Sequence, residues 1–140
     1  MKKYKVGYTQ GVYDLFHIGH LNLLNNAKKH CDYLVVGVNS DELVKKYKQK
    51  TPIISEHDRA EIVKNIKSVD EVIIVDTLDK TKIHDFVKFD AVFIGSDWKN
   101  TPRWQKTEED LKKIKCDVIY LDYTEGVCSS TLRKKIGDID

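Results

Sequence analysis

The sequence predicts an α/β fold, a doubly wound sheet of five parallel strands, with residues 1–140 as a single domain. Two observations lead to this prediction. First, short apolar runs rich in Val, Ile and Tyr alternate along the whole chain with segments whose apolar residues recur at helical spacing. Second, these runs lack a polar face, which is typical of strands that helices cover on both sides. The chain has 140 residues, 41% of them hydrophobic, and this suits one ordinary domain.

The predicted elements alternate strictly between strand and helix. Gly, Asp or Asn residues bound each predicted strand, and each predicted helix has apolar residues three or four positions apart. The predicted strands are Tyr4–Thr9, Tyr33–Val38, Val72–Val75, Ala91–Ile94 and Val118–Leu121. The predicted helices contain Leu21, Leu24 and Ala27, then Ile62, Val63 and Ile66, then Ile83, Phe86 and Val87, and finally Leu111 and Ile114.

The fold class also predicts where a ligand binds. In doubly wound sheets the ligand lies beyond the carboxyl ends of the strands, at the point where the winding direction reverses. We therefore expect the functional loops to be those that follow Thr9, Gly37, Val75, Ile94 and Leu121.

Composition excludes several classes of protein. Lys and Arg number 24 against 22 Asp and Glu, so the net charge of +2 does not favour a nucleic-acid-binding protein. No window approaches 18 apolar residues, so we expect no membrane insertion. The three cysteines lack a C-x-x-C pair and are expected to be free thiols, which indicates a cytoplasmic protein.

The stretch GVYDLFHIGH, residues 11–20, carries the most specific chemical signal. His17 and His20 are three residues apart and open the helix that follows the first strand, so they point to one side of it. The free N–H groups of a helix start attract anions, and Gly19 leaves room for a phosphate. One alternative is a helix cap beside a surface histidine. Another is zinc, but zinc helices space their histidines four apart, and no third ligand is near.

This stretch resembles the H-x-G-H signature of the nucleotidyltransferase superfamily. The class I aminoacyl-tRNA synthetases share the literal HIGH, but they are several times longer, and the chain has no KMSKS-like segment. Four further segments resemble the small cytidylyltransferases, above all the glycerol-3-phosphate cytidylyltransferases, and the resemblance covers nearly the whole chain. These segments are CDYLVVGVNSDELVKKYK, KTPIISEHDRAEIVKNIKSVDEVI, IGSDWK and YTEGVCSST.

The resemblance implies a Rossmann-like fold, a homodimer and transfer of CMP from CTP to a small phosphorylated alcohol such as glycerol 3-phosphate. The products would be a CDP-alcohol and pyrophosphate, with Mg²⁺ bound mainly through the nucleotide and no metal site in the protein. The implied catalytic residues are His17, His20 and Lys48. The implied nucleotide-binding residues are Gly11, Val12, Tyr13, Gly19, Asp97, Trp98, Thr124, Glu125, Gly126, Cys128, Ser129 and Ser130. The implied substrate-binding residues are Asp14, Arg59 and Lys67.

Each implied role has a structural alternative. Lys48 would offset charge on the leaving pyrophosphate, whereas most lysines of its cluster are expected to be solvated. Arg59 has the fork that suits a phosphate monoester, or else forms an exposed salt bridge with Glu56. Asp14 could cap the helix, and Trp98 could pack in the core instead of contacting the nucleotide.

The last motif departs from the family pattern. Ser129 and Ser130 open a terminal helix whose hydroxyl and N–H groups could hold the far phosphates of the nucleotide. The family has an arginine and a serine where this chain has Tyr123 and Cys128, and Lys67 stands in place of another arginine. These changes weaken the case for the phosphate contacts and the choice of base.

Two rival functions remain. An adenylyltransferase acting on a sugar 1-phosphate, as in ADP-heptose synthesis, shares several of these segments, but the TEG triplet and the compact length favour cytidylyl transfer. A nucleotide-binding module without turnover is the other rival. The intact His17, Gly19 and His20 argue against it, because a module that only binds has less need for transition-state donors.

Overall fold

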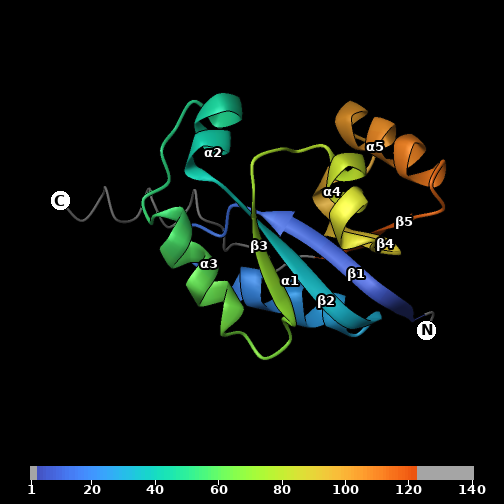
Figure 1. Cartoon of the computed structure of the whole chain (residues 1–140), viewed down its shortest axis with the longest axis horizontal. Coiled ribbons are helices and arrows are strands. Elements are labelled where there is room, and N and C mark those ends of the chain that lie inside the picture. The colour runs from blue at the N-terminus through green and yellow to red at the C-terminus, as the bar shows by residue number, and fades with distance from the viewer. Residues whose placement is uncertain (1–2, 123–140) are drawn as a thin grey trace.

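The computed structural model describes residues 3–122, which contain a five-stranded sheet with every strand parallel to its neighbours. The strand order is β3-β2-β1-β4-β5 (Figure 1). The predicted doubly wound sheet is therefore confirmed. The strands are β1 (Tyr4–Gly11), β2 (Cys31–Asn39), β3 (Glu71–Val75), β4 (Ala91–Gly95) and β5 (Asp117–Leu121).

The winding direction reverses beside the central strand. From β1 the chain moves outward to β2 and β3, and then returns to place β4 and β5 on the other side of β1. The carboxyl ends of β1 and β4 thus flank the switch point, where ligands of such sheets bind. The segments that follow Gly11 and Gly95 lie at this point.

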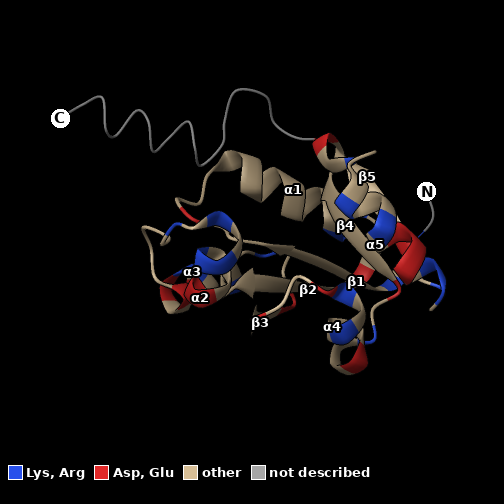
Figure 2. Cartoon of the chain, turned by 90° about the horizontal axis from the view of Figure 1, so that it is seen from above, with Lys and Arg blue, Asp and Glu red and all other residues tan. Residues whose placement is uncertain are grey.

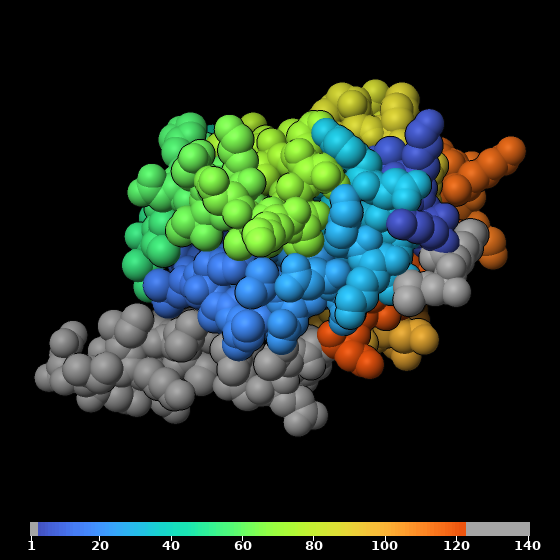
Figure 3. Space-filling view, turned by 90° about the horizontal axis from the view of Figure 1, so that it is seen from below, coloured from blue at the N-terminus to red at the C-terminus, as the bar shows by residue number. Residues whose placement is uncertain are grey.

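Helices cover both faces of the sheet. α1 (Ile18–Lys28) and α3 (Glu56–Lys64) pack on one face through a first core, and the space-filling view shows α1 in blue and α3 in green (Figure 3). α4 (Lys80–Val87) and α5 (Pro102–Lys112) pack on the other face through a second core. Figure 2 shows α1 and α4 on opposite sides of the strands. No helix of the described part is long and apolar enough to cross a membrane.

Helix α2 (Asp41–Lys48) was not among the predicted helices. Ser40 caps it by accepting the Leu43 N–H, its first turn is acidic and its last turn is basic, all of which stabilise a short helix. Only Leu43 and Val44 are buried. Its apolar stripe is too short for the periodicity to stand out in the sequence.

One glycine is required by a close approach within the sheet. A Cβ atom on Gly37 would lie 2.0 Å from the hydroxyl oxygen of Tyr8. The space above Gly37 lets this buried hydroxyl donate to Oε1 of Gln10 at 2.8 Å. Gln10 thereby becomes the start of a polar network at the carboxyl end of β1.

Candidate active site

The loop between β1 and α1 turns sharply and is held in place by two of its own buried side chains. Tyr13 and Leu15 both have left-handed backbone conformations, with φ of 56° and 50°. The side chain of Tyr13 is buried in the first core, so its predicted nucleotide contact is left to its backbone. The carboxylate of Asp14 is also buried and accepts the N–H groups of Ile53 and Ile54 at 2.8 and 2.9 Å. Asp14 therefore ties this loop to the segment before α3, and the alternative that it caps α1 is wrong.

The cap of α1 is the histidine pair itself. Nδ1 of His17 accepts the Gly19 N–H at 3.0 Å, and Nδ1 of His20 accepts the His17 N–H at 3.2 Å. The two rings stack with their centroids 4.0 Å apart. Because both Nδ1 atoms accept, the proton of each neutral ring is assigned to Nε2. The pair thus presents two Nε2–H donors and is both a helix cap and a candidate ligand site.

Burial keeps both imidazoles uncharged at neutral pH. Burial lowers the pKa of His17, and burial followed by the charge of His17 lowers the pKa of His20 to about 4, against a smaller opposing effect of Asp14. Nε2 of His17 is itself buried and has no hydrogen-bond partner among residues 3–122. An unsatisfied buried donor is unfavourable, so this atom is suited to a ligand oxygen. The predicted phosphate contact at the Gly19 N–H is less direct, because His17 already occupies that group.

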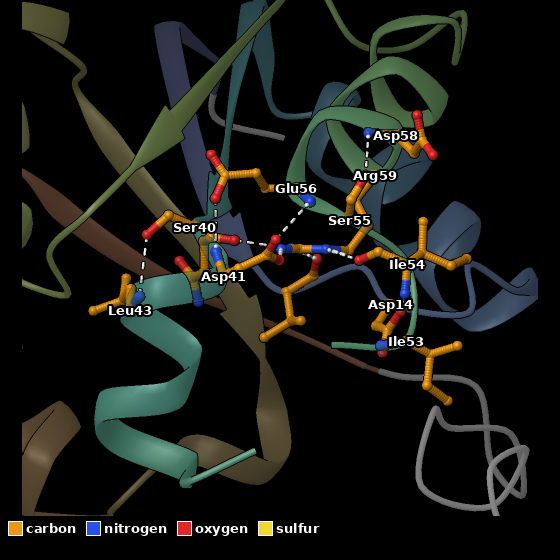
Figure 4. A network of polar contacts seen from close by, with 12 residues as sticks. Asp14, Ser40, Asp41, Leu43, Ile53, Ile54, Ser55, Glu56, Asp58 and Arg59 are labelled. Carbon is orange, nitrogen blue, oxygen red and sulfur yellow. Dashed lines mark hydrogen bonds and ion pairs between the residues drawn. The ribbon is translucent and has the colours of Figure 1, made fainter. Parts of the chain in front are cut away.

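Arg59 has no solvent exposure and lies in a polar network with Asp41 and Ile54 (Figure 4). Its Nε donates to the Ile54 carbonyl at 2.8 Å, and its Nη1 donates to the carbonyls of Val12 and Asn39 at 2.7 and 2.8 Å. Its Nη2 pairs with Asp41 at 2.5 Å. The guanidinium of Arg59, predicted to bind a phosphate, is therefore bonded to acceptors of the protein itself. Val12 contributes its backbone carbonyl to this network.

The alternative for Arg59, an exposed salt bridge with Glu56, is wrong. The ion-pair partner is Asp41, and the carboxylate of Glu56 instead accepts the Asp41 N–H at 3.0 Å. The Glu56 N–H in turn donates to the carboxylate of Asp41 at 3.3 Å. These contacts hold the start of α2 against the start of α3. The contact of Arg59 with the substrate phosphate stays a prediction.

The two predicted lysines are both exposed. Lys48 is the exposed last residue of α2, with its ammonium 5.7 Å from the centre of the Tyr47 ring. Lys67 is exposed in the turn before β3, three residues before Asp70, which pairs with Lys28 in the last turn of α1. His17 caps the opposite end of that helix. Within the described chain, the structure does not bring Lys67 to the site.

Asp97 and Trp98 do lie at the switch point. They belong to the short 3₁₀ helix η1 (Ser96–Trp98), which directly follows β4. Trp98 is 40% exposed, and the guanidinium of Arg103 stacks on its ring at 5.1 Å. The alternative that Trp98 packs in the core is therefore wrong, and the buried tryptophan is Trp104. An exposed ring at this point is available to a nucleotide.

The rest of the predicted nucleotide cradle lies outside the described residues. Its members are Thr124, Glu125, Gly126, Cys128, Ser129 and Ser130.

The structure adds a polar network that sequence reasoning missed. The Gln10 amide donates to Asn39 Oδ1 and to the Thr77 carbonyl, at 2.8 and 3.0 Å, and Asn39 donates to the Tyr47 hydroxyl at 3.0 Å. These contacts link the carboxyl ends of β1 and β2 to α2 and to the loop before α4. A polar residue late in a buried strand, such as Gln10, was the available signal.

Comparisons with known proteins identify the family of the chain. A sequence model of the cytidylyltransferase-like family matches residues 8–135. A glycerol-3-phosphate cytidylyltransferase of Bacillus spizizenii is 37% identical over 94% of this chain and 96% of its own length, and one of Staphylococcus aureus is 35% identical over 91% and 92%. The bifunctional protein HldE of Helicobacter pylori is 34% identical, but the matched part is only 28% of that protein.

A solved structure is similar as well. The lipopolysaccharide core biosynthesis protein of Thermoplasma volcanium superposes with a TM-score of 0.72 and 28% sequence identity, over 86% of this chain and 97% of that one. The fold and the histidine pair define a nucleotidyltransferase. The chain belongs to the cytidylyltransferase-like family, as the sequence motifs predicted.

Proposed function

We propose that the protein transfers CMP from CTP to a small phosphorylated alcohol of the glycerol 3-phosphate kind, releasing pyrophosphate. This proposal rests mainly on the neutral, stacked histidine pair at the start of α1, which has two Nε2–H donors at the switch point. The similarity to glycerol-3-phosphate cytidylyltransferases over nearly the full length of both chains supports the choice of CTP and acceptor.

The reaction requires positioning and charge stabilisation, because the acceptor phosphate itself attacks the α-phosphorus. In this proposal Nε2–H of His17 and of His20 donate to the α-phosphate and its bridging oxygen, where negative charge develops. Neutral imidazoles can donate in this way without giving up a proton. Lys48 would offset charge on pyrophosphate, and Asp97 with Trp98 would contact the ribose or base.

Mg²⁺ is proposed to accompany the triphosphate. Among the described residues, no group of three or more His, Cys, Asp or Glu side chains is placed to hold a metal ion. The buried carboxylate of Asp14 already accepts two backbone N–H groups. The ion would supply charge neutralisation when bound, with the nucleotide as its main ligand.

Pyrophosphate release with CTP and with ATP, against a panel of phosphorylated alcohols and sugar 1-phosphates, tests the function. We expect turnover with CTP and glycerol 3-phosphate or a related polyol phosphate. CTP binding without turnover on any acceptor would instead identify a non-catalytic module.

A second candidate is adenylyl transfer to a sugar 1-phosphate. The similarity to HldE and to the lipopolysaccharide core biosynthesis protein favours it. Turnover with ATP and a sugar 1-phosphate, without turnover with CTP, would select this candidate.

We further propose that the protein works in the cytoplasm as a homodimer. Free buried thiols at Cys31 and Cys116 are consistent with a reducing compartment. Light scattering of the purified chain measures the oligomeric state, and a monomer at micromolar concentration would contradict the dimer.

A further inference from the structure

A lysine that the proposed function does not use is buried near the switch point. Lys80, the first residue of α4, is only 6% exposed. Its ammonium lies 5.0 Å from the centre of the Trp104 ring, in the first turn of α5. Among residues 3–122 it has neither a hydrogen bond nor an ion pair. A buried ammonium without a counter-ion is unfavourable, so it is expected to serve a ligand.

The neighbouring groups are donors and cations rather than acceptors. Nε1 of Trp104 is buried and has no hydrogen-bond partner among the described residues. The guanidinium of Arg103 is close enough to act on Lys80, because burial and then the charge of Arg103 lower the pKa of Lys80 to about 8. Asp79, whose charge opposes this lowering of the pKa, is engaged in capping α4 through the N–H and hydroxyl of Thr81.

The N-termini of α4 and α5 lie close together at this point, and the N-terminus of α5 has no side-chain cap. The hydroxyl of Thr101, just before this helix, donates to the Trp98 carbonyl. The Gln10 amide, which binds the Thr77 carbonyl, holds the loop before α4 against the end of β1. Two helix starts, two cations and an indole N–H therefore converge beside the central strand, and this combination attracts an anion.

We propose that Lys80, Arg103 and Trp104 form a second anion-binding subsite, which takes the phosphate of the acceptor monoester. The inference rests on the function proposed above, in which the acceptor brings a second phosphate group to the site. The histidine pair opens α1 on one face of the sheet, whereas Lys80 and Trp104 belong to the opposite face. In-line displacement requires the attacking phosphate to lie opposite the leaving group, and the two clusters approach β1 from opposite sides.

The chain's two tryptophans make the subsite directly observable, because each gives one indole N–H signal in a ¹⁵N correlation spectrum. The probes are inorganic phosphate, glycerol 3-phosphate and CTP, each added alone, and Trp104→Phe assigns the signal. Phosphate and glycerol 3-phosphate are expected to shift the Trp104 signal saturably in the wild type, and to leave it unchanged in Lys80→Met. A saturable shift of equal size with CTP alone would overturn the assignment to the acceptor.

Kinetics and stability give independent readouts. Lys80→Met is expected to raise KM for the acceptor at least tenfold and to leave KM for CTP within twofold. Lys82→Met removes the same charge from an exposed position of the same helix and is expected to change neither. The thermal midpoint of Lys80→Met is expected to equal or exceed that of the wild type, since an unpaired buried charge is removed. A lowered midpoint would assign Lys80 to the fold instead.

Failure of this inference is distinguishable from failure of the proposed function. CTP-dependent turnover with an unchanged acceptor KM in Lys80→Met would overturn the subsite alone. Saturable binding of glycerol 3-phosphate at Trp104, without pyrophosphate release from any nucleotide, would overturn the function and leave the anion subsite standing.

Discussion

Arg59 donates to the backbone carbonyl of Val12 at 2.7 Å, although 46 residues of chain lie between them. The bond joins the buried start of α3 to the loop that carries the histidine pair. Because the same guanidinium binds the Asn39 carbonyl and Asp41, it fixes the ends of β1 and β2 relative to each other. The histidines are thus positioned by a residue that does not contact them.

Replacing Arg59 by Met should destabilise the protein severely. The change leaves Asp41 without its ion-pair partner and three backbone carbonyls without a donor, and removing one member of a buried pair lowers stability by about 3–5 kcal/mol. Chemical denaturation measures the effect. Glu61→Met on the exposed face of the same helix serves as the control and should stay within about 0.5 kcal/mol of the wild type. An Arg59→Met variant of wild-type stability would contradict the buried network.

Replacing His20 by Ala should lower kcat by roughly 10²- to 10³-fold, the usual effect of removing one transition-state donor. His20→Asn separates the two tasks of this side chain, because its amide oxygen can still accept the His17 N–H while no donor remains at the Nε2 position. We expect His20→Asn to keep the stability of the wild type and to lose activity. Saturating kinetics within threefold of the wild type for either variant would remove His20 from the catalytic residues.

Stability should fall on acidification partly because of His20. The folded-state pKa of His20 is about 4, below the value of about 6.5 in the unfolded chain, so the unfolded state binds more protons between these values. The contribution is complete above pH 6.5 and decreases as the pH falls towards 4. His20→Asn lacks this titration, so its stability should decline less steeply over the same window, as measured by urea denaturation. Equal slopes for the two proteins would contradict the lowered pKa.

Replacing Gly37 by Ala should disturb the polar network from inside the sheet. The new methyl group would lie 2.0 Å from the Tyr8 hydroxyl and would push it away from Gln10. Overpacking of this kind lowers stability by about 1–3 kcal/mol. Tyr8→Phe in the same background removes the hydroxyl and should recover much of the loss. A single Gly37→Ala variant as stable as the wild type would show that Tyr8 moves without strain.

The doubly wound parallel sheet was predictable, because it follows from repeating patterns. The same patterns predict the edge of the sheet at which the site should lie. Apolar runs such as Ala91–Ile94 form buried strands when helices alternate with them, and parallel strands place the loops after their carboxyl ends at one edge of the sheet. The histidine spacing likewise predicted an anion site at the start of α1. The boundaries differed only by one or two residues, as for β2, where Cys31 and Asn39 extend the predicted strand.

Other features depend on contacts that no local pattern encodes. Arg59 was predicted to bind a substrate phosphate, with an exposed salt bridge as the alternative, whereas its guanidinium is buried and its acceptors come from three separate segments, around Val12, Asn39 and Ile54. The sequence around Lys80, which follows an aspartate, is that of an ordinary helix start. Its burial becomes evident only in the folded structure, where Trp104 packs beside it. Tertiary packing decides whether such residues are buried, so their burial could not be predicted from the sequence of the segment alone.

The two hydrogen bonds from Ile53 and Ile54 to Asp14 make a remote peptide segment a reporter of the turn before His17. Exchange of these two amide protons with heavy water requires the bonds to the carboxylate to open, through movement of the turn or of the segment itself. Their exchange rates therefore measure how often this tie between the turn and the segment opens, in the resting protein and with no substrate present.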